Sequence, residues 1–295
     1  MSPLAALWLD VVITALWPLI GAAGLRDYAA VPFVGAGLVL GALCMAPWLL
    51  RQGRLRRMIA ADAAPSLAAM GFFSGAASLV YVAALAYTTP VNAVILAQSE
   101  VVYSAVLSAL FLGERLTLKQ SLASALVIGG TALIVVHDLR SPRWRGDLMI
   151  LASPWMYQVS HVLSKKLPRD LDAWTLSGGR ALYGALFMLP LCAWALLHGA
   201  RWSWAPAALG VLALQGALSC SANLVLWYVA LRGLELSKAT TIMLSYPALT
   251  FVLSWLLGRE PIHAVQVLGL AATFAGAAWT ARLTAGSGRE LISEV

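Results

Sequence analysis

A stretch of about fifty residues occurs twice in this chain. Residues 81–130 align without a gap with residues 227–276, 146 positions later. Apolar identities carry little weight in so apolar a sequence, so the evidence rests on the polar matches, which are Ser99/Ser245, Ser108/Ser254, Glu114/Glu260 and Gln120/Gln266. The chain is therefore a duplication, and about half of it forms one folding unit.

Both copies are too apolar for a soluble domain. Of the 295 residues, 61% are hydrophobic and only 11% are charged, whereas charged residues make up about 25% of soluble proteins. Windows of about 20 apolar residues, the length that a helix needs to cross a membrane, can be placed ten times. They cover residues 4–24, 31–50, 65–87, 91–112, 118–137, 147–165, 173–197, 205–231, 237–257 and 262–283. We therefore expect an all-α integral membrane protein with ten transmembrane helices.

The basic residues indicate how the chain is oriented. Alternating the loops between the two faces places 13 Lys and Arg residues on the face that holds both termini and 6 on the other face. By the positive-inside rule, both termini then lie in the cytoplasm. The net charge of +7 does not favour nucleic acid as a partner, because the basic residues form no patch with interleaved aromatic residues.

The N-terminal segment is expected to stay in the membrane. No basic residue precedes the apolar core of residues 4–24, as one would in a signal peptide, so we expect an uncleaved first span. The predicted location is a bacterial-type inner (plasma) membrane, with the lipid bilayer as the surrounding partner.

Five spans in each copy make the second unit enter the membrane from the opposite face. We place the first unit at residues 1–141, the second at residues 142–284, and a short flexible cytoplasmic tail at residues 285–295. The second and seventh spans also correspond, as GALCMAP (41–47) and GALFMLP (184–190). Two inverted units of five helices are typical of secondary transporters, whose substrate site lies between the units near the midplane.

Each unit closes on a related segment, LFLGERLT at residues 110–117 and LLGREPIH at residues 256–263. In these segments and their spacing, the chain resembles the EamA-type transporters of the drug/metabolite transporter (DMT) superfamily over nearly its whole length. The resemblance implies a ten-helix exporter of amino acids or similar small metabolites that works by alternating access, with aromatic amino-acid exporters as one branch. One departure is that the family's proline in spans four and nine is present as Pro247 but replaced by Val101 in span four.

A charge inside a span costs roughly 2.5–3.5 kcal/mol and usually faces the bundle interior, and three ionisable residues in predicted spans stand out as candidates. Glu100 shares a helical stripe with Ser104 and Ser108. It either lines the cavity, where it would titrate or hold a substrate ammonium, or is a structural carboxylic acid bonded to a neighbouring helix. His161 is either a core histidine or a proton-coupling group. For Arg180 we favour snorkelling to the interface or a backbone partner over binding of a substrate carboxylate.

Neutral polar residues form stripes at helical spacing in two corresponding spans. The stripes consist of Ser74, Ser78 and Tyr81 in span three and of Gln215, Ser219, Asn223 and Trp227 in span eight. These faces line a cavity, or they form interhelical hydrogen bonds worth about 0.6 kcal/mol each.

Two tryptophans lie deep in the first helix of their own unit, each beside a proline. They are Trp17, next to Pro18, and Trp155, next to Pro154. A proline frees a backbone carbonyl and favours a kink. We hypothesise that both indoles flank the substrate cavity as gates or stacking surfaces.

No feature of the sequence indicates an enzyme. Glu114 and Glu260 repeat, but in an inverted topology they lie on opposite faces of the membrane and cannot form a catalytic pair. We expect both to be caps or ion-pair anchors of tight helical turns. Gly35, Gly37 and Gly41 resemble a dinucleotide fingerprint, but they lie within an apolar helix and favour close helix packing. We expect no catalytic residue, no metal and no cofactor.

The sequence thus predicts an exporter of small amphiphilic metabolites, with amino acids as the first choice. Alternating access would occur through a cavity between the units, lined by spans one, three, four, six, eight and nine. The alternatives are a membrane-embedded enzyme acting on a lipid-linked substrate and a passive channel. The oligomeric state is open, with a monomer as the simplest case. The candidate substrate-binding residues are Trp17, Ser78, Tyr81, Gln98, Glu100, Trp155, Gln158, His161, Asn223, Trp227 and Tyr246.

Overall fold

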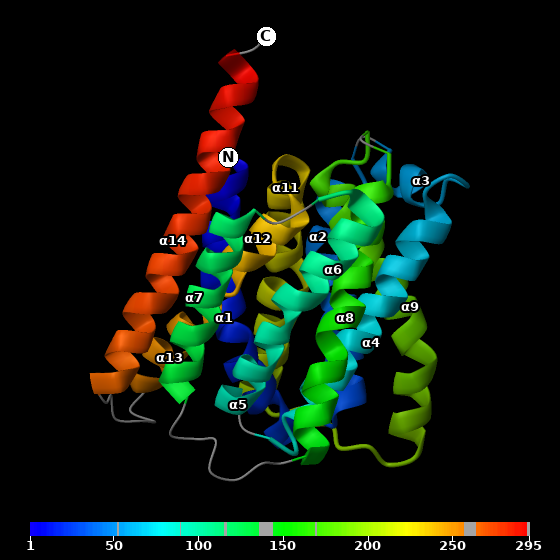
Figure 1. The fold of residues 1–295 in the computed structure, drawn as a ribbon. Coiled ribbons are helices and arrows are strands. Elements are labelled where there is room, and N and C mark those ends of the chain that lie inside the picture. The colour runs from blue at the N-terminus through cyan, green and yellow to red at the C-terminus, as the bar shows by residue number, and fades with distance from the viewer. Residues whose placement is uncertain are drawn as a thin grey trace.

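The computed structural model is a bundle of helices, with no strand among the residues that it describes (Figure 1). It describes the whole chain except residues 52, 89, 115–116, 136–143, 169, 257–263 and 294–295. The first half contains α1 (Pro3–Asp27), α2 (Ala30–Leu49), α3 (Arg54–Met58), α4 (Ala64–Ala84), α5 (Pro90–Leu96), the 3₁₀ turn η1 (Ala97–Ser99), α6 (Glu100–Leu112) and α7 (Leu118–Val135). The second half contains α8 (Trp144–Lys166), α9 (Ala173–Leu197), α10 (Pro206–Leu214), the π-helical segment η2 (Gln215–Ala222), α11 (Asn223–Gly233), α12 (Leu236–Met243), α13 (Tyr246–Leu256) and α14 (Ala264–Ser293).

The prediction of an all-α fold is confirmed, and each of the ten expected segments is helical over most of the residues that the structure describes. Three of them are interrupted: the fourth at η1, the eighth at η2, and the ninth between α12 and α13. The third ends at Ala84 and not at residue 87, and α14 continues past residue 283 to Ser293. The short helix α3 lies in a connection for which no helix was expected.

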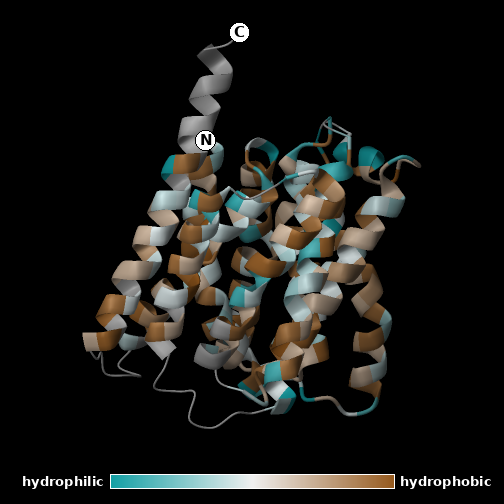
Figure 2. Ribbon diagram, in the orientation of Figure 1, coloured by the Kyte–Doolittle hydropathy of each residue, from teal (hydrophilic) through white to brown (hydrophobic). Residues whose placement is uncertain are grey.

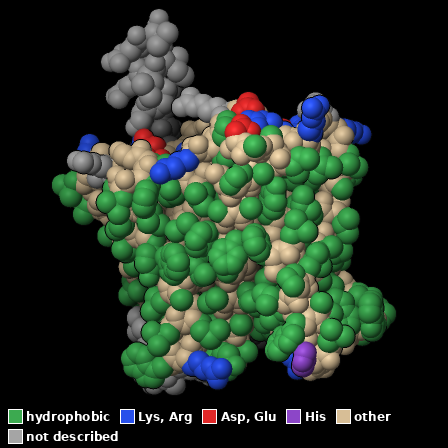
Figure 3. Space-filling view, turned by 90° about the vertical axis from the view of Figure 1, so that its right-hand side faces the viewer, with side chains coloured by type: hydrophobic (Ala, Val, Ile, Leu, Met, Phe, Trp, Pro, Cys, Tyr) green, Lys and Arg blue, Asp and Glu red, His purple; other side chains and the backbone are tan. Residues whose placement is uncertain are grey.

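The surface of the bundle fits a lipid environment. Six helical segments in the described part of the chain are long and apolar enough to cross a membrane, namely Pro3–Asp27, Ala30–Leu49, Ala64–Ala84, Ala173–Leu197, Pro206–Gly233 and Leu236–Leu253. Two shorter apolar helices cover Ala97–Leu112 and Val267–Thr280. On the face shown in Figure 3, a broad hydrophobic band separates two edges that carry the charged side chains. Figure 2 shows hydrophilic residues concentrated in the connections at the upper edge, above the more hydrophobic helices.

The packing of the two units is consistent with an inverted repeat. α1 begins at the upper edge of the bundle and α8, its counterpart, begins at the lower edge (Figure 1). α1 packs on α11, while α8 packs on α4, the counterpart of α11. In the same way, α4 packs on α9, while η2 packs on α2. Each of these contacts therefore has a partner generated by exchanging the units, as a pseudo-two-fold axis in the membrane plane requires.

Two corresponding glycines show this reciprocity at atomic distance. A Cβ added to Gly130 in α7 would lie 2.6 Å from the backbone N of Thr273 in α14. A Cβ added to Gly276 in α14 would lie 3.0 Å from the backbone N of Val127 in α7. Val127 and Thr273 are themselves equivalent in the repeat, so α7 and α14 approach through the same small-residue contact in both directions.

The close helix packing predicted for the glycines of α2 is present. A Cβ at Gly41 would lie 2.5 Å from the carbonyl oxygen of Cys220 in η2. Added Cβ atoms at Gly35 and Gly37 would lie less than 3.0 Å from the side chains of Cys192 and Gln215, respectively. The second span can therefore lie against two helices of the other unit only because it lacks side chains at these points.

Candidate functional site

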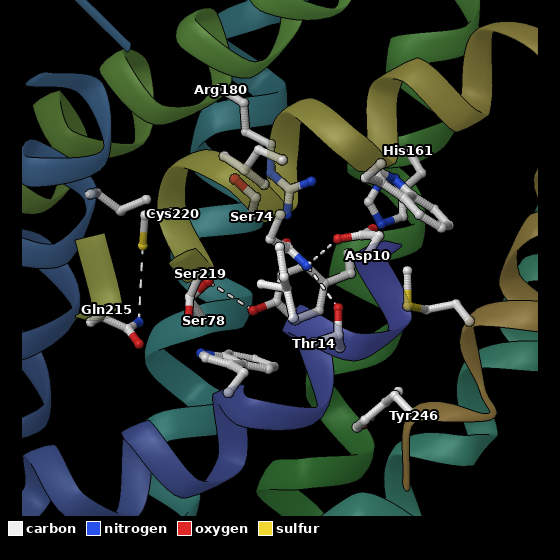
Figure 4. Close-up of a pocket in the computed structure, with 18 of the residues that line it drawn as sticks. Asp10, Thr14, Ser74, Ser78, His161, Arg180, Gln215, Ser219, Cys220 and Tyr246 are labelled. Carbon is white, nitrogen blue, oxygen red and sulfur yellow. Dashed lines mark hydrogen bonds between the residues drawn. The ribbon is translucent and has the colours of Figure 1, made fainter. Parts of the chain in front are cut away.

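A cavity lies between the two units (Figure 4). Its volume is about 130 Å³, and since one water molecule needs roughly 10–15 Å³ on the same measure, a small organic molecule fits. The polar lining residues are Asp10, Thr14, Ser74, Ser78, Glu100, His161, Arg180, Gln215, Ser219 and Asn223. The other lining residues are Ile13, Trp17, Leu38, Tyr157, Cys220, Leu224, Trp227, Met243 and Tyr246. Besides the six spans expected to line it, α2 and α9 contribute one residue each.

A buried carboxyl group joins α1 to the helix that follows η2. Asp10 is fully buried, and Thr14 lies one turn further along α1 on the same face. Asn223 Nδ2 donates to Asp10 Oδ1 at 2.8 Å and to Thr14 Oγ1 at 2.7 Å. Asp10 Oδ2 has no hydrogen-bond partner among the described residues. The two units are thus connected here by a polar contact that still has capacity for another donor.

Arg180 lies inside the bundle, with 6% of its surface exposed. Its Nη1 donates to the hydroxyl of Tyr228 at 3.2 Å, and its guanidinium carbon lies 5.7 Å from the ring centre of Tyr157. The expectation that it snorkels to the interface is wrong, because α9 packs against α2, α4 and α11 and the side chain is buried. The bond to Tyr228 uses one of five N–H donors, so the guanidinium keeps donors for a ligand in the cavity.

His161 and Trp227 form a second polar pair across the units. The indole Nε1 of Trp227 donates to His161 Nδ1 at 2.9 Å, and the ring centres are 4.8 Å apart. Because Nδ1 accepts this bond, the neutral imidazole carries its proton on Nε2. Both side chains line the cavity, so the pair orients the ring without closing it off.

Glu100 begins α6, directly after the 3₁₀ turn. Gln158 Nε2 donates to Glu100 Oε1 at 2.7 Å, which fixes the carboxyl group against α8. Nearby, Trp17 stacks on Tyr81 with 4.3 Å between ring centres and meets the ring of Tyr157 edge-on at 6.1 Å. The carboxyl group therefore lies in a mainly aromatic part of the lining.

The interruptions of the fourth and ninth spans meet each other. Gln98 in η1 donates from Nε2 to the carbonyl oxygen of Leu244, at the break between α12 and α13, over 3.1 Å. These two residues correspond in the repeat. Both spans are broken although only the ninth has a proline, Pro247, and the fourth has Val101 instead. Interrupted helices near the midplane are typical of transporter binding sites, because they leave backbone groups unpaired.

Seven of the eleven candidate residues line the cavity, namely Trp17, Ser78, Glu100, His161, Asn223, Trp227 and Tyr246. Three others lie directly behind it: Tyr81 stacks on Trp17, Gln158 holds Glu100, and Gln98 bonds Leu244.

Trp155 does not flank the cavity, and that hypothesis is wrong. Its side chain is 40% exposed on the outside of α8 and packs edge-on against Phe73 at 6.1 Å between ring centres. One residue along a helix turns the side chain by about 100°, so Trp155 faces away although its neighbour Pro154 is buried. The residues of α8 that reach the cavity are Tyr157 and His161.

Sequence reasoning missed Asp10 and Tyr157. Asp10 is an acidic residue seven positions inside the first helix, so the rule applied to Glu100, that an ionisable residue in a span faces the interior, would have found it. Tyr157 carries no such signal, since tyrosine is common in spans. Among the described residues, no group of three or more His, Cys, Asp or Glu side chains could hold a metal ion.

Both halves of the chain match the same family, the EamA-like transporter family, over residues 2–136 and 144–282. The chain belongs to this family. It is therefore a multi-pass membrane transporter of the DMT superfamily and not an enzyme. The two matched regions agree with the duplication read from the polar identities.

Two relatives are similar to this chain in sequence. A probable terminal-alkyne amino-acid exporter of Streptantibioticus cattleyicolor is 29% identical over 190 residues, which cover 64% of this chain and 63% of the relative. An uncharacterized transporter of Methanothermobacter thermautotrophicus is 26% identical over 199 residues, which cover 64% of this chain and 56% of the relative. The matched part is thus less than two thirds of either relative's length.

A solved structure described only as "Crystal structure of protein" shares the fold. It superposes with a TM-score of 0.78 over 96% of this chain and 98% of its own, at 15% identity. At this identity the likeness concerns the EamA fold alone.

Proposed function

We propose that this EamA-family transporter exports amino acids or similarly small amphiphilic metabolites by alternating access through the cavity between its units. The observation that carries the proposal is the lining: Arg180, Asp10 and Glu100 share one small cavity with aromatic and apolar side chains. A guanidinium suits a carboxylate by bidentate geometry, and a carboxylate suits an ammonium. An amino acid presents both groups, and a relative named as a probable amino-acid exporter is consistent with this choice.

We propose the lining residues as the substrate site, with Tyr81, Gln98 and Gln158 in support. The two moving bodies are the units at residues 1–141 and 142–284, and residues 285–295 form a tail. The meeting of the two interrupted helices at Gln98 and Leu244 supports a rocking motion about that point. The location is an inner (plasma) membrane with both termini in the cytoplasm, in line with the excess of basic residues on that face. The proposal involves no cofactor and no nucleic acid.

Transport by purified protein in liposomes tests the proposal. A panel of radiolabelled amino acids is offered with and without a pH gradient, and we expect saturable uptake that accelerates when unlabelled substrate is trapped inside. A passive channel would give flux that neither saturates nor accelerates in this way. Absence of uptake for every amino acid would overturn the proposal.

Arg180→Gln is the matched variant for the carboxylate. A hydrogen bond to a charged group is worth about 1.5–3 kcal/mol, so we expect uptake at low substrate concentration to fall about tenfold or more. Arg56→Gln makes the same change at an exposed arginine of α3 and should leave uptake unchanged. Equal uptake by both variants would remove Arg180 from the site.

A further inference from the structure

The charges in the cavity do not balance. Its lining contains two acidic side chains, Asp10 and Glu100, and one basic side chain, Arg180. His161 accepts a hydrogen bond on Nδ1, as a neutral imidazole does. The α-ammonium and α-carboxylate of an amino acid cancel each other, so its backbone leaves the excess acidic group without a counter-charge. An unpaired carboxylate away from water is costly and takes up a proton instead, so a ligand that brings one more positive charge is favoured because that charge takes the place of the proton.

The two carboxyl groups lie at different levels of the cavity. Asp10 and Trp17 are seven residues apart on α1, which corresponds to about 10 Å along the helix axis. Asp10 is at the level of Arg180, with which it is close enough to interact electrostatically, and Figure 4 shows both side chains in the same half of the cavity. Glu100 also interacts electrostatically with Arg180, but Gln158 of α8 holds it, and it lies close enough to interact with Tyr157 and Tyr246 as well. The cavity thus has a polar end for an amino-acid backbone and an aromatic end for its side chain.

The aromatic end is built to hold a cation. Gln158 fixes Oε1 of Glu100 at 2.7 Å, and Oε2 makes no hydrogen bond with any residue that the structure describes, so it is available to a ligand. Trp17, Tyr157 and Tyr246 line the cavity, and Trp17 meets Tyr157 edge-on, while the Tyr157 ring also lies 5.7 Å from the guanidinium carbon of Arg180. Their rings present electron-rich faces, which attract ammonium and guanidinium groups by about 0.5–2 kcal/mol each. An aliphatic side chain placed here would exclude water from Glu100 without forming a hydrogen bond or an ion pair with it.

We propose that the amino acid carried by this protein has a cationic side chain, and that Glu100 binds that cation among the three rings. The α-carboxylate lies at Arg180 and the α-ammonium at Asp10. This inference rests on the proposed function, because it assigns the amino-acid class within the same cavity. Glu100 is then the residue that distinguishes lysine from a neutral amino acid of the same length.

The experiment compares L-lysine with L-norleucine, which has the same chain length and lacks the terminal ammonium. Both are measured in liposomes as initial rates of counterflow, and as thermal shifts of the purified protein. We expect lysine to be favoured by about tenfold or more, as for loss of a hydrogen-bonded charge pair. Glu100→Gln should remove this preference by weakening lysine uptake while norleucine uptake is retained or rises. Glu114→Gln makes the same change beyond the other end of α6 and should keep the wild-type preference.

The outcomes separate the two proposals. Norleucine carried as well as lysine by the wild type would overturn the assignment of a cationic side chain and leave amino-acid transport standing. A lysine preference that survives Glu100→Gln would overturn the role of Glu100. Uptake of neither amino acid, with no thermal shift, would overturn the cationic class, and absence of uptake across the whole amino-acid panel would overturn the proposed function itself. If Glu100→Gln does not fold, the comparison of the two ligands on the wild-type protein still decides the class.

Discussion

Asn223 is the side chain that connects the polar cluster of the cavity. It donates two hydrogen bonds, to Asp10 and Thr14 of α1, from the first position of α11. The π-helical segment η2 ends directly before it. Such segments are rare and often occur at functional sites, and here the extra residue per turn sets where the stripe of span eight meets α1. A single amide thereby determines both the geometry of Asp10 and the contact between the units.

Replacing Asn223 by alanine tests this role. The change leaves Asp10 Oδ1 buried without its donor, so we expect the free energy of unfolding to fall by about 1–3 kcal/mol, together with transport. Thr14→Val removes only the second acceptor and should cost less, since Asn223 still binds Asp10. Thermal unfolding in detergent measures both variants, and an equal loss in each would contradict the assignment of Asp10 as the important partner.

Asp172 shows how a charge outside the membrane secures a helix. It is the N-cap of α9, accepting from the backbone N of Thr175 at 2.8 Å, and it pairs with Arg54 Nη2 at 2.6 Å. Partial burial raises the pKa of Asp172, but the bonds from Arg54 and Thr175 outweigh it, so the pKa lies below the ordinary value. A lowered pKa in the folded state means that the carboxylate stabilises the protein at neutral pH. This stabilisation is lost as the pH falls through the pKa of the folded state.

We therefore expect Asp172→Ala to lower the free energy of unfolding by about 1 kcal/mol at neutral pH, the usual loss for an N-cap. The ion pair adds little to this, because the aspartate is 41% exposed and surface pairs are weak. The difference from the wild type should shrink as the pH falls below about 4, where aspartate becomes protonated. Unfolding curves measured across this pH range test the prediction. A difference in unfolding free energy that does not depend on pH would exclude the carboxylate as the source of the stabilisation.

At the scale of helices, the two interrupted spans are coupled through one amide. Gln98→Met keeps the size of the side chain but removes the donor to the carbonyl of Leu244. A buried carbonyl without a partner costs about 1–3 kcal/mol, so we expect lower thermal stability and an altered maximal transport rate with little change in KM. A stability equal to that of the wild type would show that another group satisfies Leu244.

The contact between α4 and α9 depends on a glycine that can be tested against its neighbour one turn away. A Cβ at Gly71 would lie 2.6 Å from the backbone N of Gly184, whereas at Gly75 the nearest atom would be at 3.7 Å. Gly71→Ala should destabilise the protein by about 1–3 kcal/mol through overpacking. Gly75→Ala should be close to neutral. Detergent unfolding of the pair measures the difference, and similar stabilities would mean that α9 moves away without cost.

For the whole molecule, the distribution of basic residues makes a prediction about orientation. Arg56 is exposed in the connection between α2 and α4, and His198 is exposed in the connection between α9 and α10 on the opposite face. With both termini in the cytoplasm, a membrane-impermeant maleimide applied to intact cells should label His198→Cys and leave Arg56→Cys unlabelled in a background without native cysteines. The reverse pattern would invert the proposed orientation.

The duplication, the ten helical segments and the membrane class follow from properties that act along the chain, namely apolar length, spacing and repeated polar residues. The same properties brought seven of the candidate residues into the cavity lining, because their polar stripes face the interior. They could not tell on which side of α8 a large aromatic residue would point, so Trp155 was misplaced. These properties also gave no reason to place the Arg180 side chain in the interior, because the residue lies near the start of its predicted span.

The orientation of Trp155 and the buried position of Arg180 were decided by packing between the units. Asp10 and Asn223 are 213 positions apart, and their contact exists because α1 and α11 lie side by side. Arg180 is retained in the interior because α2, α4 and α11 cover its helix. Hydrophobicity selects the buried face of a helix, but which side chains meet on that face depends on the close approach of other helices, and this is set only when the two units assemble.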